Sequence, residues 1–534
     1  MRKALLKGLA LLLVLSLGMG LALAGHADEW TPPAEHMDIS IMHWDIETSL
    51  EDEDDALKKF IEDRFNITFV GKPGITWDNM YEIPFNWAAA GEFPDIVSGV
   101  DLASWGGQGE WIRDGLLRPI PSDLSAYPNV AGVVAPSDVQ VFAVDGENYM
   151  LPRAMYADPG WWSMDRGILN RKDWREALGF EIPVTQQDFI DLCVAYATMD
   201  PTGKGAGYTK GLGASGHNMP FSQVWASFGF TDNYWVVNDA GECVLPVFEK
   251  TSLPLLDFLR EINKAGALDV DYITDDQETG LREKFAQDKV GMAMNQVTPG
   301  HFFHFMTEWA KVKDDGQSFV DAVEILRPPV VEGIDQPVAF SEKSFWSETY
   351  ISVDVDDAKM DRILMLFDYL YSEEGILLMA YGFEGQDWEF DADGSVALLT
   401  AVHEETGEQL RAIDLYKFAW SMQYLALWGE GTLQYTNPGF PVGIREMCQA
   451  ELEYRLANWK LDPVDWAIPA IDVEEKTEFS AVEPRVEWPK IFLDTSDKTT
   501  EELFDEAYAK WIANGYQAAK DAMTAAAVEL GYIK

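Results

Sequence analysis

Cysteine is scarce in this chain. Its 534 residues include three, Cys193, Cys243 and Cys448. Three thiols allow at most one disulfide bond and leave one cysteine over, which excludes a fold held together by disulfides. The chain can instead bury large apolar cores, because 47% of its residues are hydrophobic. We expect two domains, since single cores stop growing at about 250–300 residues.

Positive charge is also scarce. The chain has 40 Lys and Arg against 90 Asp and Glu, so its formal net charge is -50 at pH 7. Such a surface repels nucleic acid and anionic lipid, and we predict no nucleic-acid partner. A phosphorylated substrate is disfavoured for the same reason, although a local basic pocket can override the field. Adaptation to salt produces the same composition, and that alternative stays open.

Several motifs of known chemistry are missing. The chain has no phosphate-binding Gly-Lys-Ser/Thr loop and no Gly-x-Ser-x-Gly nucleophile elbow. Residues 211–216 match the dinucleotide-binding glycine pattern, but no clear long strand precedes them. His301, His304 and Glu308 have a spacing that can hold a metal on a helix, but their aromatic-rich surroundings favour ordinary packing. We predict neither a metal nor a cofactor.

Long apolar runs are missing beyond the first residues. Residues 2–7 carry three positive charges, Leu9–Leu17 is apolar, and Ala22-Leu23-Ala24 is typical of a cleavage site, with Ala27 as the alternative. This pattern predicts a signal peptide at 1–27 and an exported protein. An uncleaved membrane anchor is the alternative, disfavoured because the run is short. No cysteine lies near the cleavage site to carry a lipid, so we expect a protein free in the periplasm or held at the extracellular face by another route.

Strand and helix patterns alternate after this segment. Ile39–Met42 alternates like a strand, Glu51–Phe65 has apolar residues at helical spacing, and Asn66–Val70 is a second strand pattern. A strand, helix and strand in this order begin an open α/β sheet.

A hairpin is predicted from Val141–Val144 and Tyr149–Pro152, which flank the turn pair Asp145-Gly146. Thr185, with Asp188 three residues later, is an N-cap signal for a helix. The remaining predicted elements are strands at Pro94–Val97 and Val290–Met294, and helices at Asn170–Leu178, Leu253–Ala265, Gly280–Gln287, Asp357–Tyr371 and within Thr499–Leu530.

Three phrases of the sequence carry a resemblance. They are Leu169-Asn170-Arg171-Lys172-Asp173-Trp174, the stretch from Phe285 to Met294, and Ala380-Tyr381-Gly382-Phe383-Glu384-Gly385. In this order the chain resembles the family 1 extracellular solute-binding proteins of ABC transporters, particularly the long type that serves polysaccharide uptake.

The resemblance implies an α/β protein with the two-lobed type II periplasmic-binding-protein fold, a hinge and an interlobe cleft. A solute bound in the cleft would favour a closed state that a membrane permease recognises. We expect a monomer that binds a carbohydrate and has no catalytic residues. The expected domains are lobe 1 at 28–155, lobe 2 at 156–328, a return to lobe 1 at 329–400, and a C-terminal helical region at 401–534 that packs on both lobes.

The loop Asp200–Gly205 departs from the family pattern. In many relatives the equivalent loop resembles an EF-hand, which needs oxygen ligands at alternating positions. Here Lys204 occupies the fifth position, and an ammonium group cannot bind calcium. We expect no ion in this loop, and we expect the Lys204 ammonium to contact Asp200 instead.

Sugar rings have apolar C–H faces and a rim of hydroxyls, so a sugar site needs aromatic platforms with polar groups around them. The chain has 20 Trp, although a single Trp is more often a core residue. Residues that follow the carboxyl ends of strands, or that lie where the chain crosses between lobes, are the best candidates. They are Trp44, Asp45, Ser98, Asp101, Trp105, Arg153, Tyr156, Trp161, Trp162, Trp225, Asn295, Trp346 and Glu348, with Trp44, Trp105 and Trp162 as preferred platforms.

Other functions stay open at this point. A secreted polysaccharide-active enzyme is one, because 90 acidic residues offer many carboxylate pairs. A binder of peptide-type solutes is another, and a receptor subunit that reports occupancy to a membrane sensor is a third. The aromatic content favours a carbohydrate binder.

Overall fold

A computed structural model describes most of the chain after residue 30. The described residues are 31–44, 46–75, 79, 82–105, 107–155, 161, 165–215, 221–229, 234–274, 278–313, 316–341, 343–404, 406–427 and 431–533. The predicted signal peptide lies outside them. Within this part of the chain, no helix is both long and apolar enough to cross a membrane.

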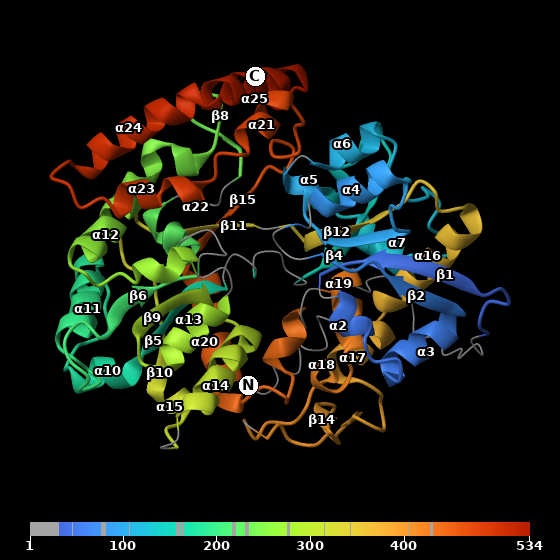
Figure 1. Cartoon of the computed structure of the whole chain (residues 1–534), viewed down its shortest axis with the longest axis horizontal. Coiled ribbons are helices and arrows are strands. Elements are labelled where there is room, and N and C mark those ends of the chain that lie inside the picture. The colour runs from blue at the N-terminus through green and yellow to red at the C-terminus, as the bar shows by residue number, and fades with distance from the viewer. Residues whose placement is uncertain are drawn as a thin grey trace. The chain divides into compact units, whose positions relative to one another are not determined.

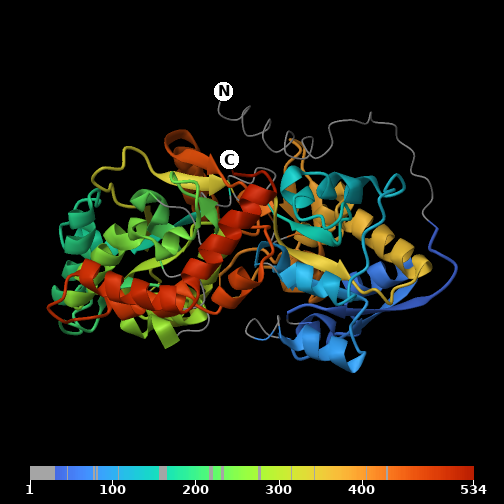
Figure 2. The same cartoon turned by 90° about the horizontal axis from the view of Figure 1, so that it is seen from above.

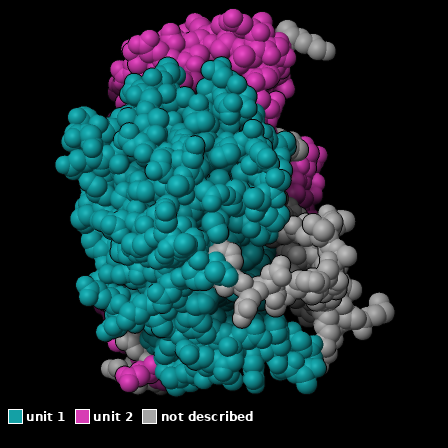
Figure 3. Space-filling view, turned by 90° about the vertical axis from the view of Figure 1, so that its right-hand side faces the viewer, with its two compact units in different colours: residues 1–159, 343–403, 408–439 teal, residues 160–342, 404–407, 440–534 magenta. Residues whose placement is uncertain are grey.

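The chain forms two compact units, coloured separately in Figure 3. Unit 1 contains residues 1–159, 343–403 and 408–439, and unit 2 contains residues 160–342, 404–407 and 440–534. Our sequence-based boundaries were 155 and 329. The return to unit 1 comes later because β11 (Val338–Ser341) pairs in parallel with β15 (Lys460–Pro463), which keeps it in unit 2.

A five-stranded sheet forms the centre of unit 1, in the order β2-β1-β3-β12-β4. Its strands are β1 (Met37–Met42), β2 (Ile67–Gly71), β3 (Ile96–Val100), β4 (Met150–Ala154) and β12 (Phe345–Ile351). The first three are parallel, and β12 is antiparallel to both β3 and β4. Every residue of β3 is buried, as expected for a strand covered on both faces.

Helices cover both faces of this sheet. In Figure 1, α4, α5 and α6 lie on one side, and α2, α3, α17 and α19 lie on the other. The helical segments of unit 1 are α2 (Ile46–Leu50), α3 (Ala56–Phe65), α4 (Glu82–Ala90), α5 (Leu102–Trp105), α6 (Gly107–Arg113), α7 (Pro128–Val134), α8 (Ser137–Gln140), α16 (Asp357–Leu370), α17 (Glu373–Tyr381), α18 (Ala412–Leu415), α19 (Phe418–Leu425) and η5 (Gly431–Tyr435), with a small hairpin of β13 (Trp388–Phe390) and β14 (Val396–Leu398).

The predicted hairpin at 141–152 is wrong. The turn itself forms, because Asp145 and Gly146 both have positive φ and Val144 bridges to Glu147. However, the second half of the prediction belongs to β4, which pairs with β12 about 200 residues later in the chain. Pairing with a distant strand leaves no local trace in the sequence.

The sheet of unit 2 has four strands in the order β10-β5-β9-β6. They are β5 (Arg166–Arg171), β6 (Lys210–Gly213), β9 (Val290–Gln296) and β10 (Val323–Leu326). Helix α11 (Gln186–Thr198) packs directly on this sheet at two glycines. A Cβ atom on Gly211 would lie 2.3 Å from the Cys193 carbonyl oxygen, and one on Gly291 would lie 2.2 Å from the Tyr196 ring. Gly211 therefore serves helix packing rather than a nucleotide.

The N-terminus of α11 confirms the N-cap prediction. The Thr185 hydroxyl accepts from the Asp188 amide, and the Asp188 carboxylate accepts from the Thr185 amide at 2.8 Å. This reciprocal capping box satisfies two amides that the helix leaves unpaired.

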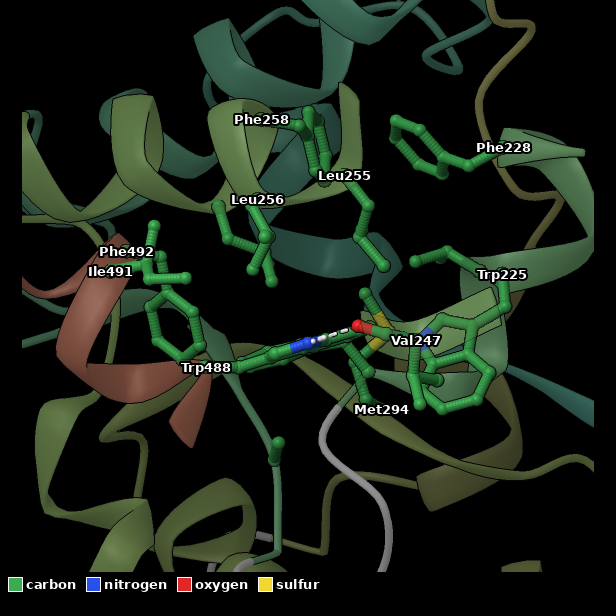
Figure 4. Packing of buried hydrophobic residues seen from close by; sticks show 14 of the residues in the cluster. Trp225, Phe228, Val247, Leu255, Leu256, Phe258, Met294, Trp488, Ile491 and Phe492 are labelled. Atoms are coloured by element: carbon green, nitrogen blue, oxygen red, sulfur yellow. Dashed lines mark hydrogen bonds between the residues drawn. The ribbon is translucent and has the colours of Figure 1, made fainter. Parts of the chain in front are cut away.

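A large aromatic core stabilises unit 2 (Figure 4). Trp225 and Trp488 lie with ring centroids 5.3 Å apart, and the Trp488 indole donates to the Val247 carbonyl at 2.9 Å. The C-terminal helices α24 (Thr500–Ala513) and α25 (Tyr516–Glu529), red in Figure 2, close this core, which includes Phe504 and Trp511. Residues 440–534 thus complete unit 2, whereas 408–439 belong to unit 1.

Unit 2 contains further helices and one further strand pair among the described residues. They are α10 (Lys172–Ala177), α12 (Leu253–Lys264), α13 (Glu278–Ala286), α14 (Pro299–Val312), α15 (Phe319–Ala322), α20 (Val442–Asn458), α21 (Glu474–Phe479), α22 (Pro484–Glu487), α23 (Pro489–Phe492), η1 (Ser222–Phe228), η2 (Pro246–Phe248), η3 (Lys250–Ser252), η4 (Val270–Thr274), and the pair β7 (Val236–Val237) and β8 (Cys243–Val244). All three cysteines are buried and unpaired.

The predicted contact between Lys204 and Asp200 is wrong. The Lys204 ammonium lies 3.9 Å from an Asp288 carboxylate oxygen and 3.5 Å from the Tyr208 hydroxyl. The Asp200 carboxylate instead accepts from the Gly205 amide at 2.9 Å and from Thr202. The Asp200 carboxylate is thus already bonded within the loop, and the Lys204 side chain extends to Asp288 outside the loop.

Candidate ligand-binding site

Four strand ends meet at one edge of the sheet in unit 1. The carboxyl ends of β1 and β3 lie together because these strands are parallel. Since β12 is antiparallel to β3, its first residues lie at the same edge. Strand β4 is antiparallel to β12 and ends there, with Ala154 opposite Phe345. Side chains distant in sequence are therefore brought together at this edge.

Aromatic side chains gather at this edge. The Trp44 ring, which follows β1, lies 5.6 Å from the Trp346 ring of β12 and 5.6 Å from the Tyr424 ring of α19. Trp420, one helical turn before Tyr424, stacks on it at 5.8 Å. We call Trp44, Trp346, Trp420 and Tyr424 the aromatic cluster. Three of them are partly or largely exposed, and only Tyr424 is buried.

Hydrogen bonds attach α19 to the sheet below. The Ser98 hydroxyl donates to the Tyr424 carbonyl at 2.8 Å and shares a hydrogen bond with Thr349 at 2.7 Å. The Ala154 amide donates to the Ala426 carbonyl at 2.8 Å. Ser98 is fully buried, so its role is to hold the helix that presents two of the aromatic rings.

Arg153 lies among these rings. Its guanidinium carbon is 4.7 Å from the centroid of the Tyr424 ring and 5.5 Å from that of Trp346, both within cation–π range. Its Nε donates to the Gln423 carbonyl at 2.6 Å.

His43 is a neutral support for the aromatic cluster. Its ring stacks on Tyr424 at 4.8 Å, and complete burial lowers its pKa to about 3. Nδ1 contacts the Trp44 carbonyl oxygen, which only accepts, so this nitrogen carries the proton. In the neutral ring Nε2 then accepts from the Ser421 hydroxyl at 2.8 Å. This ring joins the loop after β1 to α19.

Two buried acidic residues, Asp101 and Glu348, lie beneath the same edge. Lys343 and Asp101 form an ion pair at 3.0 Å, and both are buried. Glu348 accepts from the Ala103 amide at 2.6 Å and from the Tyr350 hydroxyl at 2.9 Å. Burial, together with the negative charge of Asp101, raises the pKa of Glu348 to about 8. Glu348 is therefore protonated at neutral pH and adds no charge.

The structure thus brings several predicted residues into one place. Trp44 and Trp346 have partly exposed side chains there, and Arg153 lies buried against the Trp346 ring. Ser98, Asp101 and Glu348 lie beneath as buried supports. Trp161, Trp225 and Asn295 lie in unit 2. Trp225 is 2% exposed in the aromatic core, which leaves no ring face for a ligand. Asn295 is buried at the end of β9 and accepts from the Gln296 amide at 2.6 Å, and Trp161 is partly exposed.

Some predicted residues cannot be placed. Asp45, Tyr156 and Trp162 lie outside the described residues, as does the side chain of Trp105, whose backbone forms the end of α5 after β3.

Sequence reasoning missed Trp420 and Tyr424. Their spacing of four residues puts both rings on one face of a helix, and this pattern was available in the sequence. It was overlooked because α19 begins 67 residues after the end of β12 (from 351 to 418), far from every predicted strand end. His301 is partly buried, burial lowers its pKa to about 4, and its Nδ1 shares a hydrogen bond of 2.9 Å with the Thr298 hydroxyl. No cluster of three or more candidate metal ligands occurs among the described residues.

Comparison with known proteins finds relatives whose names describe carbohydrate-binding proteins. No protein-family model matches the chain. It is 26% identical to the fructooligosaccharide ABC transporter substrate-binding protein FusA of Streptococcus pneumoniae, over 34% of this chain and 36% of FusA. It is 23% identical to the polygalacturonan/rhamnogalacturonan-binding protein YtcQ of Bacillus subtilis, over 63% of this chain and 69% of YtcQ. The match to FusA thus spans about a third of that protein.

Solved structures match over nearly the full length. An alginate-binding protein, AlgQ2, without calcium ion has a TM-score of 0.66 at 15% identity, covering 92% of this chain and 98% of that one. The complex of FusA with kestose has a TM-score of 0.65 at 15% identity, covering 93% and 99%. These similarities confirm the two-domain periplasmic solute-binding fold that the sequence resemblance implied.

Proposed function

Because this chain is related to the sugar-binding proteins of ABC importers and has their fold, we propose that it captures an oligosaccharide and delivers it to a membrane permease. The observation that carries the proposal is the aromatic cluster at the strand ends of unit 1. Trp44 and Trp346 are both partly exposed, which gives a ligand access to their rings.

The chemistry of this edge suits a sugar. Exposed indole rings offer flat apolar surfaces for the C–H faces of a pyranose or furanose ring. The positions of the rings are fixed before binding, because His43 and Ser98 attach the loop after β1 and helix α19 to the buried sheet. Preorganisation of this kind lowers the entropic cost of binding.

The remaining parts of the proposal concern partners and location. The protein acts outside the cytoplasmic membrane as a monomer, and a permease recognises its ligand-bound form. The named relatives are binding proteins, and this supports a role in capture without catalysis. A peptide-type solute, a glycan-cleaving activity and a sensory role are the competing functions.

A thermal-shift screen of the mature protein against mono- and oligosaccharides tests the proposal. A ligand at a hundredfold excess over its Kd stabilises the native state by about 2.7 kcal/mol, which gives a visible rise in Tm. Chromatography of the incubated glycans serves as the enzyme control and should show no cleavage. No shift with any glycan, or release of shorter products, would contradict the proposal.

Trp346→Ala should weaken binding of the best glycan. Loss of one stacking ring costs about 1–2 kcal/mol, which corresponds to about 5–30-fold in Kd by isothermal titration calorimetry. Phe390→Ala is the matched control, because Phe390 is an exposed aromatic residue of the same unit on β13, outside the aromatic cluster. Equal effects of both substitutions would remove Trp346 from the site.

A further inference from the structure

Arg153 is a buried cation without a carboxylate partner among the described residues. The residue is 3% exposed. Only its Nε has a protein acceptor in this part of the chain, and Nη1 is buried without one. Burial lowers the pKa of Arg153 to about 10, so the guanidinium keeps its charge at neutral pH. Buried charges in proteins are ordinarily paired, because an unpaired charge loses its hydration without gaining a compensating partner.

The surrounding ionisable groups do not supply the missing charge. Lys343 already pairs with Asp101, and both side chains are buried. Glu348 is protonated and His43 is neutral at pH 7, since their pKa values are about 8 and about 3. No described carboxylate thus forms an ion pair with Arg153, in a chain whose net charge is -50.

The position of Arg153 suits a contact with a bound ligand rather than with another protein side chain. Its guanidinium lies against the Trp346 ring, which is partly exposed, so a ring seated on Trp346 brings its substituents close to Arg153. A guanidinium fork matches the two oxygens of a carboxylate, and the charge-assisted hydrogen bonds are stronger than those to neutral hydroxyls.

We propose that the glycan captured at the aromatic cluster is acidic, and that Arg153 binds the carboxylate of a uronic-acid residue. This inference rests on the proposed function and narrows its substrate class. The anion would give the Arg153 guanidinium the charged acceptor that the described residues do not provide.

The test compares two forms of one ligand on the wild-type protein. Oligogalacturonate and its methyl ester have the same rings, so calorimetric Kd values isolate the carboxylate. We expect the acid form to bind about 10- to 100-fold tighter, with a preference that weakens as salt is raised. Equal binding of acid and ester, or tighter binding of the ester or of neutral glycans, would overturn the inference and leave the proposed function standing.

Substitutions assign the preference to Arg153. Arg153→Gln should remove the preference for the acid, and Arg153→Lys, which keeps the charge without the fork, should retain only part of it. A preference that survives in Arg153→Gln would overturn the assignment. If neither form of the ligand binds and neutral glycans do, only this inference fails. If no glycan of any kind shifts the Tm, the proposed function fails as well.

Discussion

Two buried ionisable side chains beside the aromatic cluster are neutral for opposite reasons. Glu348 is protonated because burial and Asp101 disfavour its anion, and His43 is deprotonated because burial and Arg153 disfavour its cation. Neutral His43 stabilises the fold above the ordinary histidine pKa, and this contribution is lost as pH falls towards about 3. Protonated Glu348 stabilises the fold at low pH, and this contribution is lost as pH rises towards about 8.

Glu348→Gln should flatten the stability profile between pH 4.5 and about 8. The folded-state pKa of Glu348, about 8, is above its ordinary value of 4.5. Its favourable protonation is therefore fully present below pH 4.5 and is lost as pH rises through 8, on the order of a few kcal/mol. Urea unfolding of wild type and variant from pH 4 to 9 should diverge with rising pH, the variant becoming the more stable. Parallel curves would show that Glu348 is ionised in the folded protein.

At the scale of elements, the close contact between helix α11 and the sheet determines the packing of unit 2. Helix α11 lies so near β6 and β9 that Gly211 and Gly291 have no room for a side chain. In unit 1, hydrogen bonds from Ser98 and Ala154 hold α19 on the sheet, so the rings of the aromatic cluster depend on strands distant in sequence.

Gly211→Ala should destabilise unit 2. The added methyl group would meet the backbone of Cys193, which cannot move without shifting α11, at a cost of about 1–3 kcal/mol. Gly132→Ala is the matched control, since its Cβ in α7 meets nothing within 4 Å and alanine favours the helix. Denaturant unfolding measures both. A loss no larger for Gly211→Ala than for Gly132→Ala would contradict this packing.

Local signals in the sequence predicted elements better than pairings. The Thr185 cap and the amphipathic pattern of Asp357–Tyr371 predicted α11 and α16 correctly, because helices are specified by near neighbours. The hairpin at 141–152 failed because β4 pairs with β12, and no local pattern specifies so distant a partner. For the candidate site, Trp44 was predicted from a strand end, and Arg153 and Trp346 from the expected crossings between lobes. Tyr424 was missed because a helix brings it to that edge.

On the scale of the whole molecule, each unit has its own core. The core of unit 2 combines residues from the middle of the chain with the C-terminal helices, and Trp488 is completely buried between Trp225 and Phe492 in this cluster (Figure 4). The C-terminal segment is therefore a structural part of unit 2 rather than a tail.

Trp488→Ala should destabilise unit 2 selectively. Removing a buried indole costs about 3–5 kcal/mol, and Trp488 also donates to the Val247 carbonyl. Hydrogen exchange should show faster exchange in β9 and α12, with β1 and β3 unchanged. Val486→Ala, at an exposed position two residues earlier, should change stability by no more than about 0.5 kcal/mol. Equal loss of protection in both units would show that they do not unfold independently.

The central claim is that the aromatic cluster of unit 1 binds a carbohydrate. A crystal structure with the glycan that gives the largest thermal shift tests it most directly. The account predicts a sugar ring stacked on Trp44 or Trp346, with a polar group of the sugar within hydrogen-bond distance of Arg153. A glycan bound elsewhere, with these three side chains free of it, would contradict the account.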